Sequence, residues 1–260
     1  MNIDKSAPKA RFGESISVFI LVVFLTIRVL DEIFLEFLNS SKIFVWDANW
    51  YNSILFIAVI VVIWLNRWEL QGLNVDKQFV IILIFSGLLL LLFYLPLKQG
   101  IFVGIATLFL LWLVLKDQLF FNINMSFDPF DVVFLFISLI PIITLPYSFN
   151  EKLYYKDVLS IKTVFFATYL PSVVFEEFLF RGLLWMYLQK IGLTNFGVIF
   201  FQAFIFWISH HRYIDNPYVF WFVIPFESIV FGWIILRSKA LTKSTIAHFL
   251  FNFLSGLLLY

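Results

Sequence analysis

Long apolar segments, most of them about 18–25 residues in length, follow one another along nearly the whole chain. A helix needs about 20 mostly apolar residues to cross a bilayer core that is about 30 Å thick. Hydrophobic residues make up 62% of the 260 residues and charged residues 13%. Ordinary soluble domains contain about 45–50% apolar and about 25% charged residues. The sequence therefore predicts an all-α polytopic membrane protein.

Nine candidate spans are separated by polar segments with loop-like composition. The first span carries Arg28, Asp31, Glu32 and Glu36 in its second half, so we expect it to lie partly in the membrane interface. That would leave eight full spans, and we expect a bundle of about eight to nine transmembrane helices. The spans are 16–38, 51–65, 79–97, 101–119, 130–148, 163–188, 196–212, 218–236 and 244–260.

The basic residues of the expected loops favour a cytoplasmic N-terminus, since Lys and Arg are more frequent in cytoplasmic loops. With the N-terminus inside, the cytoplasmic side would hold Lys5, Lys9, Arg11, Arg67, Lys77, Lys116, Lys190, Arg237, Lys239 and Lys243. The outer side would hold Lys42, Lys98, Lys152, Lys156, Lys162 and Arg212. The first apolar segment has no A-x-A-like cleavage site after it, so we expect a retained span and not a removed signal peptide.

Charge and cysteine content exclude several kinds of site. The formal net charge is +1, so nothing points to a nucleic-acid partner. The chain has no cysteine, which excludes disulfides, a thiolate nucleophile and thiolate metal ligands. H-E-x-x-H and G-x-S-x-G motifs are also absent.

Two carboxylates and a guanidinium lie inside the span 163–188, in the stretch "FEEFLFRG". A charged residue near the bilayer centre costs about 2.5–3.5 kcal/mol on insertion scales, so such residues usually face a bundle interior or a wet cavity. Glu177 and Arg181 are four residues apart and can form an ion pair on one helix face. Glu176 points about 100° away in a regular helix and need not share that pair. Glu176 is therefore the candidate for proton transfer.

Two of the three histidines lie on other expected spans together with a second conspicuous residue. The segment "FWISH" places Phe206 four residues before His210, and "HFLFN" places His248 four residues before Asn252. Glu176, His210, His248 and Asn252 would thus be contributed by three separate helices. The span limits put His210 near the outer end of its span and His248 near the inner end of another. Both can reach Glu176 only if a span is tilted, broken or displaced.

Several functions are compatible with this set of side chains. A glutamate and a histidine can hold and deprotonate a water molecule that attacks a peptide carbonyl, while a second histidine and an asparagine donate hydrogen bonds to the oxyanion. A glutamate and two histidines can also bind zinc with one open position, which is a competing version of the same protease. A structural lock between helices, a non-catalytic peptide-binding or immunity-type protein, and a transporter with a proton relay are further alternatives. The absence of an internal repeat argues against the transporter.

The three motifs together resemble those of one known family. "EEFLFR" (Glu176, Glu177, Arg181) is similar to the EExxxR motif of the CAAX-processing and bacteriocin-processing (CPBP or Abi) membrane proteases, "FWISH" to their FxxxH motif and "HFLFN" to their HxxxN motif. The resemblance covers about residues 165–258. We therefore divide the chain into N-terminal transmembrane helices without a recognised motif, 1–160, and a protease core, 161–260.

The resemblance implies a glutamate-dependent intramembrane endopeptidase that cleaves a membrane-associated protein or peptide. It implies that Glu176 activates the water, that His210 helps to hold it, and that His248 and Asn252 form the oxyanion site. Glu177, Arg181 and Phe206 would support these residues. The expected partners are membrane lipid and that substrate, with no nucleic acid. No cofactor or metal is expected under this reading, and zinc belongs to the competing version.

Overall fold

The computed structural model describes residues 7–29, 48–66, 72–94, 98–115 and 169–259, together with isolated positions between 133 and 141. Every regular element in these ranges is a helix, which confirms the all-α class for the described part of the chain. The expected span 130–148 lies outside the described residues except for those isolated positions.

The N-terminal part of the chain forms four helices. Each overlaps one of the first four expected spans. The ends of the second to fourth differ by at most four residues, whereas the first helix begins nine residues before its expected span and its described part ends nine residues before the expected end, because loop chemistry marks helix ends only loosely. The helices are α1 (Ala7–Val29), α3 (Ala48–Leu65), α4 (Lys77–Tyr94) and α5 (Lys98–Leu115).

The C-terminal part forms four further helical rods. The first is continuous but changes character along its length, and the third begins with a short π-helical turn. The elements are α9 (Leu170–Glu176), η2 (Glu177–Leu184) and α10 (Trp185–Lys190) in the first rod, then α11 (Asn195–Ile208), then η4 (Val219–Val223) with α12 (Ile224–Ser238), and finally α13 (Leu241–Leu259).

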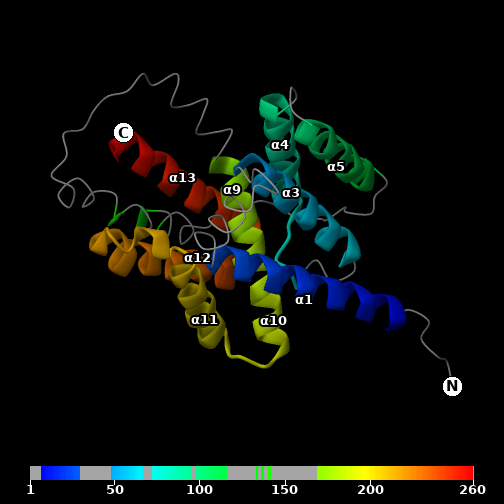
Figure 1. The fold of residues 1–260 in the computed structure, drawn as a ribbon. Coiled ribbons are helices and arrows are strands. Elements are labelled where there is room, and N and C mark those ends of the chain that lie inside the picture. The colour runs from blue at the N-terminus through cyan, green and yellow to red at the C-terminus, as the bar shows by residue number, and fades with distance from the viewer. Residues whose placement is uncertain are drawn as a thin grey trace, which may run out of the picture.

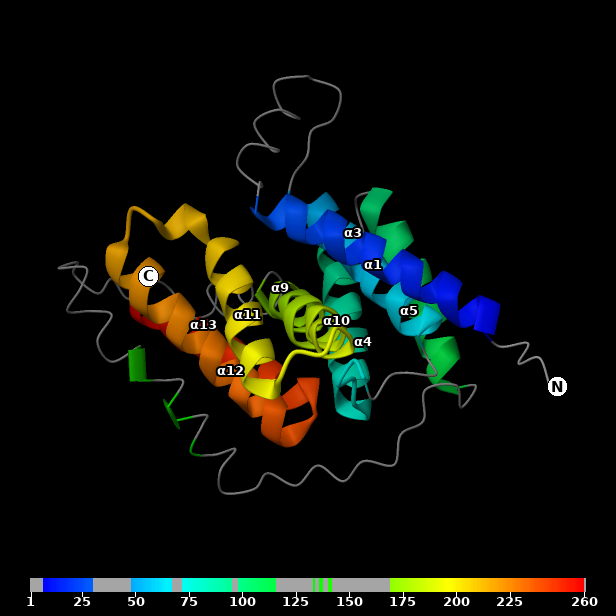
Figure 2. The same cartoon turned by 90° about the horizontal axis from the view of Figure 1, so that it is seen from below.

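The rod α9–η2–α10 is the centre of the arrangement. It lies between α1, α3, α4 and α5 on one side and α11, α12 and α13 on the other, as both views show (Figure 1, Figure 2). One apolar core runs across the rod and joins residues of both sides. Phe175 of α9 packs on Phe56 of α3 at 6.3 Å between ring centroids, and Phe178 of η2 stacks on Phe79 of α4 at 6.3 Å.

Local sequence signals explain where the C-terminal helices begin and end. Pro171 lies in the first turn of α9, where its missing N–H breaks no helical hydrogen bond. The chain leaves α10 through Gly192, whose φ of +89° suits glycine. Thr194 then caps α11 by accepting a hydrogen bond from the backbone N–H of Gly197 at 3.3 Å. Lys239 ends α12 in a left-handed conformation.

One helical stretch in the described ranges, Val219–Ser238, is long and apolar enough to cross a membrane, with a mean hydropathy of 2.1. Five other apolar helices in these ranges are shorter: Ser15–Ile27, Ile54–Leu65, Lys77–Leu90, Val103–Leu113 and Asn195–Ile208. The helices themselves were predicted from the apolar segments, whereas the number of eight to nine crossings stays a prediction.

Gly87 illustrates how tightly the N-terminal helices pack. A methyl group at this position of α4 would meet the ring of Phe56 on α3 and the hydroxyl of Thr107 on α5. Neither neighbour has room to move, because Phe56 is fully buried and Thr107 donates a hydrogen bond to the carbonyl oxygen of Val103 at 2.8 Å. The contact of α3, α4 and α5 therefore requires glycine here.

We expect Gly87→Ala to lower the free energy of unfolding by about 1–3 kcal/mol, the usual cost of overpacking a filled core. Thermal unfolding in detergent measures this cost. Leu88→Ala is a suitable control, since Leu88 is the next residue of α4 and is 44% exposed. A Gly87→Ala protein as stable as the control would contradict the close packing.

Candidate active site

The three charged residues of the central rod lie where its backbone changes from α- to π-helical geometry. Glu176 ends α9, whereas Glu177 and Arg181 lie in the π-helical segment η2. Backbone hydrogen bonds in a π-helix run over five residues, and π-helical turns are rare and frequent at functional sites. The rotation of about 100° between neighbours, which holds for an α-helix, therefore does not apply strictly here. The residue pattern alone did not predict this change of helix geometry.

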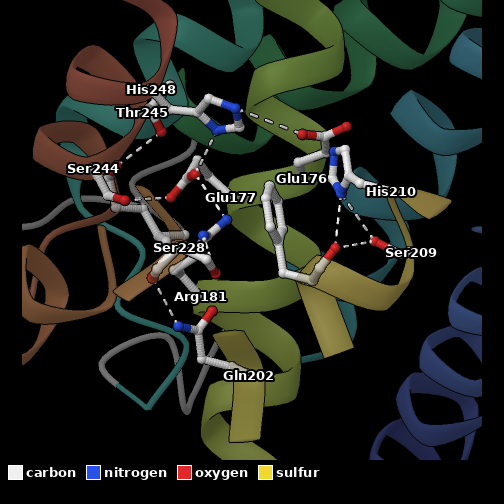
Figure 3. A network of polar contacts seen from close by, with 12 residues as sticks. Glu176, Glu177, Arg181, Gln202, Ser209, His210, Ser228, Ser244, Thr245 and His248 are labelled. Atoms are coloured by element: carbon white, nitrogen blue, oxygen red, sulfur yellow. Dashed lines mark hydrogen bonds and ion pairs between the residues drawn. The ribbon is translucent and has the colours of Figure 1, made fainter. Parts of the chain in front are cut away.

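The Glu177 carboxylate is fully buried and accepts hydrogen bonds from two helices (Figure 3). Nη1 of Arg181 lies 3.1 Å from Oε1, which is the ion pair expected from the spacing of four residues. Ser244 and His248 of α13 supply the other donors, with the Ser244 hydroxyl on Oε2 and the His248 Nδ1 atom 2.8 Å from Oε1. Glu177 thus holds the central rod and α13 together.

His248 lies between the two adjacent carboxylates. Because Nδ1 contacts Glu177, which itself accepts bonds from Arg181 and Ser244, we assign the Nδ1 proton to the imidazole. Nε2 then faces Oε2 of Glu176 at 3.7 Å, which is an ion-pair distance and too long for a hydrogen bond. The imidazole stacks on the ring of Phe231 at 4.9 Å. The ring is therefore held on its face and at one nitrogen, and its second nitrogen points to Glu176.

His210 follows the end of α11 and is also buried. Its Nδ1 atom lies 2.7 Å from the carbonyl oxygen of Phe206, which only accepts, so Nδ1 carries the proton and Nε2 is the basic nitrogen. The hydroxyl of Ser209 donates to the same carbonyl at 2.7 Å. The His210 ring packs on the Phe206 ring at 4.3 Å.

Phe206 connects the two histidines with the ion pair. Its ring lies 4.3 Å from the His210 ring, 6.0 Å from the His248 ring and 4.3 Å from Cζ of Arg181. The guanidinium over the aromatic face is a cation–π contact. The two histidines, which the span limits put at opposite ends of their spans, therefore lie against the same aromatic ring. The helix α11 ends at Ile208, before His210, whereas the expected span ran to residue 212.

Asn252 lies one turn beyond His248 on the same face of α13 and is partly buried. The structure shows no hydrogen bond from its side chain to another described residue. Of the sequence-predicted residues, the structure thus brings together Glu176, Glu177, Arg181, Phe206, His210 and His248, and it leaves Asn252 beside them without a bond of its own. The catalytic and supporting roles of all seven stay predictions.

A second layer of polar side chains supports Arg181 and was not predicted. Nη2 of Arg181 donates to the hydroxyl of Ser228 on α12 at 3.0 Å, and Gln202 of α11 donates to the carbonyl oxygen of Ser228 at 3.0 Å (Figure 3). Ser244 was missed as well, although it lies one turn before His248 and so on the same face. Small hydroxyl residues in an apolar helix carry little signal, because most of them bond to their own backbone.

Glu227 is the carboxylate that the sequence reasoning overlooked. It is 3% exposed, and neither of its oxygens has a hydrogen-bond partner among the described residues. Glu227 is one of three glutamates, with Glu176 and Glu177, that lie close enough to Arg181 to interact with it electrostatically. Glu176 was singled out because it is a charged residue in an apolar span. The same reasoning applies to Glu227 in the stretch "FESIVFG" and would have identified it as well.

The described side chains do not form a ready metal site. No three histidine, aspartate or glutamate residues among them are placed to hold one metal ion. The pair of Glu176 and His248 belongs to a network in which the other nitrogen of His248 is already bonded to Glu177.

The comparisons with known proteins agree with the motifs. Residues 159–254 match the model of the type II CAAX prenyl endopeptidase Rce1-like family. This part of the chain is therefore similar to an Rce1-like domain, which is consistent with the resemblance to the CPBP proteases. The family consists of membrane-embedded proteases. Comparisons with curated proteins and with solved structures gave no match.

We expect Arg181→Met to destabilise the protein by about 3–5 kcal/mol, because it leaves the Glu177 carboxylate buried without its cation. The double variant Glu177→Gln/Arg181→Met removes both charges and should lose less. Chemical unfolding in detergent compares the two, with Arg212→Met as the control because Arg212 is exposed. A single variant as stable as the double variant would show that the ion pair does not balance these charges.

Proposed function

We propose that this protein is an intramembrane endopeptidase in which Glu176 activates a water molecule to hydrolyse a peptide bond of a membrane-associated substrate. The observation that carries the proposal is the unequal surroundings of the two adjacent carboxylates. Glu177 accepts bonds from Arg181, Ser244 and His248 and is fully buried. Glu176 lies at the edge of the network with a side chain that is 15% exposed. A general base needs room for a water molecule beside it, and the larger exposure of Glu176 supports this role for Glu176 over Glu177.

The chemistry follows from these positions. Glu176 takes a proton from a water molecule as the water oxygen attacks the carbonyl carbon of the scissile bond. The carbonyl π electrons move onto oxygen and give a tetrahedral oxyanion. As the C–N bond breaks, the proton held by Glu176 passes to the leaving nitrogen, and the glutamate is regenerated. Donors aimed at the oxyanion contribute strongly to such reactions.

The family resemblance assigns that oxyanion to His248 and Asn252 and the water to Glu176 and His210. Two contacts support these assignments. His248 is fixed through Nδ1 by Glu177, so Nε2 is the nitrogen that faces Glu176. His210 is fixed through Nδ1 by the Phe206 carbonyl, which leaves its Nε2 as an acceptor for water. Asn252 shares a helix face with His248.

We further propose that the chain crosses the membrane several times with a cytoplasmic N-terminus. The apolar helices, the candidate span Val219–Ser238 and the membrane-embedded family support the first part. The distribution of Lys and Arg over the expected loops supports the second.

A prenylated C-a-a-X peptide is the first substrate to test, because the matching family is described as a CAAX prenyl endopeptidase family.

We expect purified, chelator-washed protein to cleave a quenched-fluorescent farnesylated CAAX peptide, and Glu176→Gln to lower kcat by at least about 10²–10⁴-fold, the contribution of a general base. The variant should unfold at the same temperature as the wild type, since the amide has nearly the same shape. Asp215→Asn is a matched control, because it makes the same chemical change at an exposed carboxylate.

Metal content measured on the same samples separates the alternatives. Metal-free cleavage that Glu176→Gln abolishes supports the general base. Cleavage that requires stoichiometric zinc would indicate that Glu176, His210 and His248 are zinc ligands. A Glu176→Gln protein that cleaves as well as wild type would contradict the assignment of Glu176 as the general base. Binding of the peptide without cleavage, by wild type and variant alike, would favour a peptide-binding protein.

A further inference from the structure

The last four residues of the connection between α3 and α4 are buried, which is unusual for a segment between helices. Loops normally run over the surface, because their backbone polar groups need water or other partners. Here the four residues from 73 to 76 are almost inaccessible, and the preceding Gly72 is exposed. The exposed fractions are 0% for Leu73, 4% for Asn74, 4% for Val75 and 1% for Asp76. These residues lie outside the part of the chain that matches the protease family.

The buried segment supplies the hydrogen-bond acceptors for the start of α13. The first backbone N–H groups of a helix have no partner within the helix. In α13 the N–H of Leu241 donates to the carbonyl oxygen of Asn74 at 2.9 Å, and the N–H of Thr242 donates to Oδ1 of Asp76 at 3.0 Å. Asp76 thus caps a helix that begins 165 residues later in the chain, in a place where a carboxylate also suits the helix dipole.

The same segment is bonded to the central rod. The side-chain amide of Asn74 donates to the carbonyl oxygen of Arg181 in η2 at 3.1 Å. Asn74 has a φ of 54°, a conformation that asparagine tolerates better than most residues. A methyl group on Gly182 would lie 3.2 Å from the carbonyl oxygen of Leu73, so glycine allows this close approach. Residues 73–76 therefore contact both elements that carry the candidate site.

We propose that the segment Leu73–Asp76 is a positioning element that fixes the start of α13 against η2, and thereby sets His248 at its distance from Glu176 and Glu177. Ser244 and His248 follow the capped Thr242 by two and six residues, so a shift of the first turn moves both side chains that contact Glu177. This proposal rests on the proposed function for its effect on catalysis. The contacts that it invokes do not depend on that function.

The two oxygens of Asp76 have different surroundings, and this difference defines the conservative variant. Oδ1 accepts the bond from Thr242, whereas Oδ2 has no hydrogen-bond partner among the described residues. Burial raises the pKa of the Asp76 carboxyl, and hydrogen bonds from Thr242 offset part of this effect. Asparagine keeps an acceptor at Oδ1 without a charge, and it caps helices about as well as aspartate. Asp76→Asn should therefore preserve the positioning that Asp76→Ala removes.

The test compares Asp76→Ala, Asp76→Asn and Asn74→Gly with the exposed-loop control Gly72→Ala. Asn74→Gly keeps the left-handed backbone and removes only the donor to Arg181. We expect Asp76→Ala and Asn74→Gly to lower kcat for the farnesylated peptide about 10–100-fold with KM within about twofold, since a displacement of about 1 Å in a catalytic group has effects of this size. Asp76→Asn and Gly72→Ala should stay within about threefold of wild type.

Hydrogen exchange of the peptide that covers residues 241–247, measured in detergent, gives a readout without cleavage. We expect Asp76→Ala to speed exchange at the start of α13 at least about tenfold and Asp76→Asn to retain protection, because only the alanine variant loses the cap. Wild-type exchange in Asp76→Ala, or faster exchange with unchanged kcat, would overturn the proposal. Equal losses in Asp76→Asn and Asp76→Ala would overturn it as well. If the wild type cleaves no peptide, the proposed function fails, and exchange still decides whether the segment holds α13.

Discussion

The buried carboxylate of Glu177 is the interaction on which the site depends. A charge in an apolar interior is tolerated only when it is paired and hydrogen-bonded, and removing one partner leaves an unbalanced charge. Arg181 reaches Glu177 from the same rod, while Ser244 and His248 reach it from α13. Satisfying this single group therefore fixes the relative position of two helices that are far apart in the sequence.

Arg181 extends the same constraint to the other side of the site. Its guanidinium bonds Ser228 of α12 and lies over the ring of Phe206 of α11, so every rod of the C-terminal part contacts the ion pair or its partners. Two neighbouring glutamates acquire different surroundings as a result. Glu177 accepts bonds from three donors and is fully buried, whereas the side chain of Glu176 lies at the edge of the network and is 15% exposed. Environment, and not residue type, distinguishes them.

The sequence predicted most of the helices and six of the side chains that the structure brings together, because both rest on local rules. Apolar segment length indicates helices, and a spacing of four residues puts Glu177 beside Arg181. The bond from Glu177 to His248 could not be predicted, since it joins residues 71 positions apart. The π-helical segment, the supporting residues Ser228 and Gln202, and the cap from Asp76 likewise depend on tertiary contacts. Glu227 was predictable by the rule that found Glu176.

The packing also shows why the family match does not mark an independent unit. The central rod presents Phe175 and Phe178 to Phe56 and Phe79 of the N-terminal helices, so the protease-like segment alone would expose these rings. The start of α13 takes its acceptors from Asn74 and Asp76, which precede the matched residues by more than 80 positions. A helix whose first N–H groups lack partners frays at that end. The N-terminal helices carry no recognised motif, yet they complete the geometry on which His248 depends. We therefore infer that the motifs identify the side chains of the candidate site, and that the buried residues 73–76 help to hold α13, and with it His248, in position.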